Sequence, residues 1–122
     1  MNNHFISLSQ AIDMTTRYRS EKENILSPEF RGKNILLLAE TFDRALFDKL
    51  LSEKDCASIR IYFGMKEDLQ VRVIVVGVNS KNEDLLPAGE PGSATTETDG
   101  NSIGEEGAPC PTWCPVSSPL NG

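Results

Sequence analysis

The chain of 122 residues has little of what specialised chemistry usually needs: one histidine, one tryptophan and three cysteines. It also lacks a long apolar run, because the longest, residues 35–39 and 73–78, fall far short of the ~20 residues that span a bilayer. Its first residues have no basic region followed by a long apolar core, so they do not read as a secretory signal. We therefore expect a cytoplasmic protein with no membrane partner.

Basic residues are missing from the last third of the chain. All 12 Lys and Arg residues lie before Pro87, together with 13 acidic residues, whereas residues 87–122 carry five acidic residues and no base. Phosphate binding depends on Lys and Arg clusters, so this distribution argues against nucleic acid as a partner. The segment 87–122 also holds six of the seven prolines and six of the nine glycines. The composition predicts a small α/β domain over 1–86 and a disordered, acidic, Pro/Gly-rich tail over 87–122.

Two helices are predicted in residues 1–86. Ser7 and Gln10 have the spacing of a capping box and are followed by apolar residues at helical spacing, which indicates a helix near 8–23. Asp43 is placed to cap a second helix near 44–53, whose apolar residues again recur at helical spacing.

Three strands complete the predicted domain. The continuous apolar run at 35–39 is typical of a strand that is buried on both faces. Residues 58–64 alternate, with Ile59, Ile61 and Phe63 expected on the buried face. Residues 69–78 are rich in β-branched side chains and should pair with 58–64 in an antiparallel hairpin.

This order, α-β-α-β-β, predicts an α+β fold. A strand–helix–strand unit implies a right-handed crossover between parallel strands, and the hairpin adds an antiparallel third strand. We expect a small two-layer α/β sandwich, with two helices on one face of a three-stranded mixed sheet, followed by the disordered C-terminal tail. The open edges of such a sheet are candidate docking surfaces and would also allow a homo-oligomer.

The end of the tail carries the most distinctive motif, with Cys110 and Cys114 separated by three residues that include Trp113. The two thiolates could bind zinc or Cu(I), although a structural zinc site needs four ligands. They could instead form a reversible disulfide. A proline-rich segment with Trp113 could also dock in a partner's groove. The remaining reading is a terminus with no specific chemistry.

Few other residues point to a site. Arg17 and Arg19 lie near the end of the first predicted helix, where cations interact well with the helix dipole, and they are further candidates for partner binding. His4 lies near a terminus, and Cys56 has no histidine close to it in sequence. The chain has no glycine-rich phosphate loop and no clear acid–base pair. We therefore predict no catalytic residue, no cofactor and a protein that is not an enzyme.

Three features together resemble a set of short bacterial proteins: SLSQAIDMTTRYR at 7–19, IRIYFG at 59–64 and the proline-rich double-cysteine terminus. No activity is assigned to that set, so the resemblance implies a bacterial cytoplasmic protein and carries over no site residue. The sequence favours an interaction or accessory domain that binds another protein. The alternatives are a thiol redox or metal-handling protein that uses the terminal cysteines, and an immunity or antitoxin-like protein.

Overall fold

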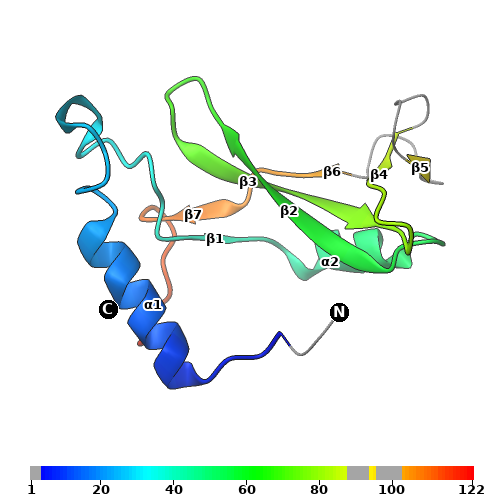
Figure 1. Cartoon of the computed structure of the whole chain (residues 1–122), viewed down its shortest axis with the longest axis horizontal. Coiled ribbons are helices and arrows are strands. Elements are labelled where there is room, and N and C mark those ends of the chain that lie inside the picture. Colours follow the sequence, from blue (N-terminus) through cyan, green and yellow to red (C-terminus); the bar gives the residue numbers. More distant parts are fainter. Residues whose placement is uncertain (1–3, 88–93, 96–102) are drawn as a thin grey trace. The chain divides into compact units, whose positions relative to one another are not determined.

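The computed structural model (Figure 1) describes residues 4–87, 94–95 and 103–122. It divides into two compact units, Met1–Ala39 with Pro109–Gly122 and Glu40–Ala108. The helices and strands are α1 (Leu8–Glu21), a 3-10 turn (Pro28–Phe30), β1 (Ala39–Thr41), α2 (Arg44–Ser52), β2 (Ser58–Met65), β3 (Val71–Val78), β4 (Leu85–Leu86), β5 (Ala94–Thr95), β6 (Ile103–Gly104) and β7 (Ala108–Cys110). Neither of the helices in the described residues is long and apolar enough to cross a membrane.

The first helix begins as its sequence predicts. The backbone N–H of Gln10 donates to Ser7 Oγ at 3.0 Å, and the N–H of Ser7 donates to Gln10 Oε1 at 2.9 Å. Both halves of the capping box are therefore formed, and each satisfies a backbone donor that the first turn of a helix leaves free. The helix ends at Glu21, close to the predicted end near residue 23.

The predicted strand over 35–39 is wrong. Gly32 and Asn34 have positive φ values of 74° and 54°, so the chain turns immediately before the apolar run. Ile35 is buried, but regular pairing begins only with β1, which joins β7 in a two-stranded sheet. Since β1 does not pair with β2, the predicted parallel crossover is absent from the described part of the chain.

The C-terminal segment 103–122 is ordered, so the prediction of disorder over 87–122 is wrong for these residues. In the first unit, the N–H of Leu38 donates to the carbonyl of Cys110 at 3.0 Å, and Arg19 Nη1 donates to the carbonyl of Leu120 at 2.7 Å. These hydrogen bonds join the segment to residues far away in sequence, which its composition does not reveal. The rest of the predicted tail, 88–93 and 96–102, lies outside the described residues.

The predicted hairpin is confirmed and forms the sheet of the second unit. β2 and β3 pair antiparallel along their whole lengths, from Ser58–Val78 to Met65–Val71. β6 pairs antiparallel with the other side of β3, so the order is β2-β3-β6 and the sheet is not mixed, contrary to the prediction. Its third strand comes from the segment that was expected to be disordered. β4 and β5 form a separate short parallel pair.

The second helix is also confirmed, and it packs against β2 and β3. Leu50 of α2 and Val75 of β3 are each 1% exposed and belong to the core of this unit. A Cβ atom on Gly104 would lie 2.6 Å from both terminal methyl carbons of Leu46, so a side chain at this position of β6 would require Leu46 to shift. Because α1 belongs to the other unit, the predicted layer of two helices is not formed within the unit that holds the sheet.

Candidate functional site

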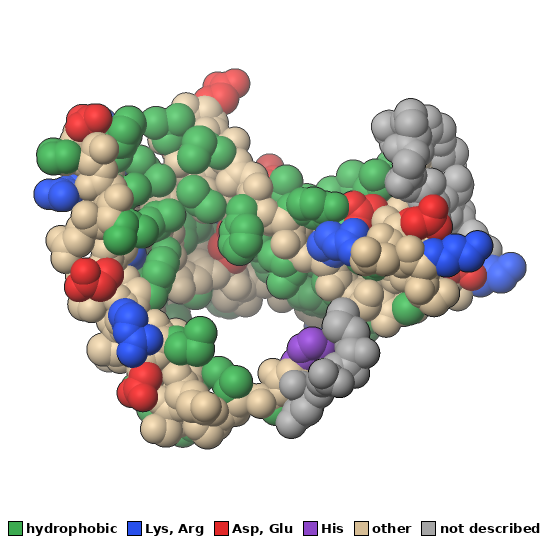
Figure 2. Space-filling view, viewed as in Figure 1, with side chains coloured by type: hydrophobic (Ala, Val, Ile, Leu, Met, Phe, Trp, Pro, Cys, Tyr) green, Lys and Arg blue, Asp and Glu red, His purple; other side chains and the backbone are tan. Residues whose placement is uncertain are grey.

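Large apolar side chains are exposed along β2 and at the hairpin turn. Ile61 is 55% exposed, Phe63 79%, Met65 61% and Leu69 40%, and we call these four residues the hairpin surface. Ile61, Phe63 and Met65 share one face of β2 because side chains alternate along a strand. Hydrophobic side chains also reach the surface in the space-filling view over the region of β2 and β3 (Figure 2). Contiguous exposed apolar residues of this kind mark interaction surfaces more often than single ones do.

The exposure of this face contradicts the sequence interpretation, which placed Ile59, Ile61 and Phe63 in the core. Ile59 is half-buried, but the other two are exposed. The nine residues of α2 extend over roughly 14 Å, whereas the eight residues of β2 extend over roughly 26 Å. The helix therefore covers only part of the sheet, and Val75 is buried while its cross-strand neighbour Ile61 is not.

One edge of the β2 backbone is a further candidate docking surface. Within the described residues, β2 is an outer strand of its sheet. The N–H of Lys66 donates to the carbonyl of Gln70 at 3.0 Å, so the even-numbered residues of β2 are those that bond to β3. The odd-numbered residues, including Ile61 and Phe63, direct their N–H and C=O groups away from β3. Residues 58–65 contain neither Lys nor Pro, which often protect such edges.

The opposite face of β2 carries a polar cluster. Arg60 donates to side-chain oxygens of Asp84 and Asn82, and the Tyr62 hydroxyl donates to the second oxygen of Asp84. The hydrogen bond with Tyr62 and the charge of Asp84 raise the pKa of the Arg60 guanidinium. The Arg60 cation is therefore already paired within its own chain.

A buried ion pair joins Arg72 of β3 to Glu40 of β1. Arg72 Nη2 donates to Glu40 Oε2 at 3.2 Å and to the carbonyl of Gly107 at 2.5 Å, and both charged side chains are 7% exposed. Arg72 Nε lies 3.1 Å from Glu40 Oε1, but its N–H is not aligned for a hydrogen bond. The hydrogen bond that Arg72 donates to Glu40 is the main cause of a raised pKa for Arg72. The sequence gives no signal for this pair, whose members lie 32 residues apart.

The two terminal cysteines, Cys110 and Cys114, are joined in a disulfide in this structure. Of the states that the sequence left open, the structure therefore contains the oxidised one. Cys110 is fully buried, Cys114 is half-buried, and Trp113 between them is 60% exposed. Cys110 Sγ lies 3.6 Å from Asn121 Oδ1. In this form neither sulfur is a thiolate, and the described residues hold no group of three or more His, Cys, Asp or Glu that could bind a metal ion.

The two arginines that were predicted as partner-binding candidates have different environments. They are two positions apart on α1 and therefore point in directions about 200° apart. Arg17 is exposed, whereas Arg19 is half-buried and bonds to the carbonyl of Leu120 and to Thr16 Oγ1. The contacts of Arg19 are those of a residue that fixes the C-terminal segment to the helix.

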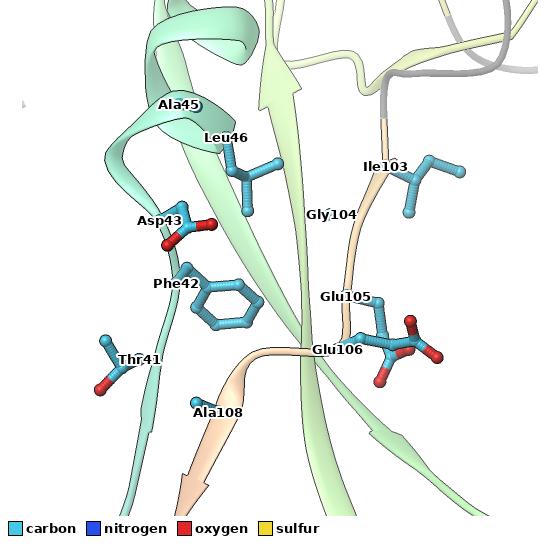
Figure 3. A pocket seen from close by; sticks show the side chains of 10 residues that line it. All are labelled: Thr41, Phe42, Asp43, Ala45, Leu46, Ile103, Gly104, Glu105, Glu106 and Ala108. Carbon is cyan, nitrogen blue, oxygen red and sulfur yellow. The ribbon is translucent and has the colours of Figure 1, made fainter. Parts of the chain in front are cut away.

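A pocket of about 410 Å³ opens beside α2 and β6 in the second unit (Figure 3). Its apolar lining includes Phe42 and Leu46, and three carboxylates lie around it, from Asp43, Glu105 and Glu106. The lining therefore combines apolar side chains with three acidic groups and the hydroxyl of Thr41.

The chain matches no protein-family model, no curated protein and no solved structure.

Proposed function

We propose that the protein is a non-enzymatic interaction domain that binds an extended strand of another protein chain along the outer edge of β2. The observation that carries this proposal is the coincidence of an open backbone edge with the exposed side chains of Ile61, Phe63 and Met65. In strand addition, the backbone groups of the edge supply hydrogen bonds, and alternate side chains supply specificity.

The size of this surface favours reversible binding. Covering a large apolar side chain that is already partly buried contributes about 1–2 kcal/mol, and each new backbone hydrogen bond about 1 kcal/mol. Association itself costs about 4–15 kcal/mol in lost translational and rotational freedom. The three exposed side chains and a few hydrogen bonds therefore suit a weak or moderate complex.

Affinity capture with the full chain tests the proposal. Phe63→Arg places a charge at the most exposed residue of the hairpin surface, while Met14→Arg makes the same change at a residue of α1 that is 60% exposed. We expect partner proteins to be retained by the wild type and by Met14→Arg and to be lost from Phe63→Arg. Recovery of the same partners with all three proteins would contradict the proposal.

A second candidate function is thiol–disulfide exchange, which the bond between Cys110 and Cys114 favours. A thiolate of a partner dithiol would attack the half-buried Cys114 sulfur more readily than the fully buried Cys110 sulfur. The S–S bond would break, and the Cys110 sulfur would leave as a thiolate that takes up a proton. The partner's second thiolate would then displace Cys114, leaving this chain reduced and the partner oxidised.

Redox titration of the full chain tests this second candidate, with the fluorescence of Trp113 between the cysteines as the signal. A reduction potential more oxidising than about −300 mV would support exchange, since structural disulfides generally lie below that value. A lower potential would show that the bond is structural. In the reducing cytoplasm that the sequence suggests, persistent structural disulfides are rare.

A further inference from the structure

We propose that the strand docking on β2 is β2 of a second copy of this chain, so that two sheets join in an antiparallel dimer centred on Ile61. This inference rests on the proposed function and names the partner. It is drawn from three properties of β2: the direction of the backbone groups that face away from β3, the arrangement of its apolar side chains and the position of its one charged residue.

The backbone direction sets the pairing. Because the odd-numbered residues of β2 direct their N–H and C=O groups outward, Ile61 of one copy can exchange two hydrogen bonds with Ile61 of the second copy. The same register places Phe63 opposite Ile59 of the second copy, and the two-fold axis repeats that contact. The exposed apolar side chains of the two strands then cover one another on one face of the joined sheet.

Charge disfavours two of the neighbouring registers. A centre on Arg60 would set two arginines directly opposite each other, and a centre on Phe63 would set Arg60 opposite Lys66 of the second copy. Like charges in directly opposed positions are destabilising. A centre on Tyr62 avoids both clashes but places Arg60 opposite Gly64, which has no side chain to contact.

The centre on Ile61 places Arg60 opposite Tyr62 of the second copy. A guanidinium can lie against a tyrosine ring in a favourable cation–π contact. Arg60 is already paired with Asp84 in its own chain, so the dimer would enclose no uncompensated cation. The one charged residue of β2 is therefore compatible with self-pairing in this register.

The oligomeric state of the full chain is the first test. Sedimentation velocity over a range of concentrations should show a reversible shift from the 13.4 kDa monomer to a species of twice that mass. Ile61→Arg, which places two like charges at the two-fold axis, should weaken self-association by at least about tenfold, while Met14→Arg should leave it unchanged. A wild type that stays monomeric up to millimolar concentration would overturn the dimer.

Cysteine crosslinking tests the register, in a Cys56→Ser background that retains the Cys110–Cys114 bond. In the proposed register, opposed Cα atoms at position 61 lie ~5.5 Å apart, within the range a disulfide can bridge. The two copies of position 63 are displaced by four residues, or ~13 Å along the strand. Ile61→Cys should therefore crosslink at least about tenfold faster than Phe63→Cys, although Phe63 is the more exposed residue.

Equal or faster crosslinking by Phe63→Cys would overturn the register. The result also separates this inference from the proposed function. Suppose that the wild type is monomeric but captures partners that Phe63→Arg does not. That result overturns the proposal of a second copy and leaves the proposed function standing, because a different chain then occupies the edge. Self-association that Ile61→Arg and Phe63→Arg both leave unchanged overturns the inference, because the dimer then uses another surface.

Discussion

Glu40 and Arg72 form an ion pair that is almost sealed from water, with each side chain 7% exposed. The same carboxylate accepts the backbone N–H of Val73 at 2.9 Å, on the side of β3 that faces away from β2. One acidic side chain thus neutralises the arginine of β3 and pairs a backbone group of that strand. Because this pair helps to hold β3, it supports the strand that positions β2.

Removing one member of this pair should be costly. Arg72→Met leaves the Glu40 carboxylate buried without its counter-ion, and we expect the free energy of unfolding to fall by about 3–5 kcal/mol. Urea unfolding measures the loss. The control is Arg44→Met, which removes an exposed ion pair with Asp48 and should cost no more than about 1 kcal/mol. An equal loss of unfolding free energy in the two variants would contradict the claim that the Glu40–Arg72 pair is buried and stabilising.

The docking of β6 against α2 can be tested at Gly104. Gly104→Ala would place a methyl group 2.6 Å from the terminal carbons of Leu46, and we expect a loss of about 1–3 kcal/mol in the free energy of unfolding. The comparison is Ala108→Gly in the nearby strand β7, a change that adds no side-chain atom. Gly32→Ala would not serve, because the positive φ of Gly32 would itself strain an alanine. A disordered tail would instead make Gly104→Ala neutral.

Glu23 should make the free energy of unfolding depend on pH in the acidic range. Its carboxylate accepts the N–H of Gly32 at 2.6 Å and pairs with Lys22 at 2.9 Å, and these contacts lower the pKa of Glu23 below its ordinary value. The unfolded chain therefore takes up this proton first as the pH falls. The contribution to stability is complete above the ordinary pKa and is lost as the pH falls through the lower pKa of the folded state.

Glu23→Gln should accordingly make unfolding less sensitive to pH as the pH falls below the ordinary pKa of a glutamate, 4.5. Urea unfolding at a series of pH values measures this, with Glu29→Gln as a control at an exposed carboxylate. If Glu23→Gln leaves the acid sensitivity of the wild type unchanged, the contacts of Glu23 with Gly32 and Lys22 do not act in solution.

The terminal disulfide should contribute modestly to stability because its loop is short. The cysteines are four positions apart, and closing so small a loop raises the free energy of the unfolded chain by about 2 kcal/mol through lost conformational entropy. Replacing both Cys110 and Cys114 with Ser should lower the free energy of unfolding by about that amount, as measured by urea unfolding. An unchanged value after full replacement would show that the bond does not form in the folded chain.

Local sequence signals predicted the elements whose causes are local. The capping box at Ser7 and Gln10 marks the start of α1, and the alternation over 58–64 marks β2. The strand pairings of β6 and β7 were missed because they depend on residues far away in sequence. Gly104 fits against Leu46, and Leu38 bonds to Cys110, contacts that neither composition nor spacing reveals.

The candidate site was predicted only in part. Alternation correctly divides β2 into two faces, but it does not say which face is covered. That depends on the length of α2, which is too short to reach Phe63. The expectation of docking at an open sheet edge stays a prediction, and the structure specifies which edge and which side chains to test.

The most direct test of the central claim is amide hydrogen exchange along β2 in the full chain, measured by NMR at low and high protein concentration. In the monomer, Tyr62, whose N–H faces β3, should exchange slowly, and Ile61 and Phe63 should exchange quickly. At high concentration the account predicts strong protection of Ile61 and Phe63 as a second strand covers the edge. Exchange at Ile61 and Phe63 that is fast at every concentration, and in the presence of every captured partner, would contradict it.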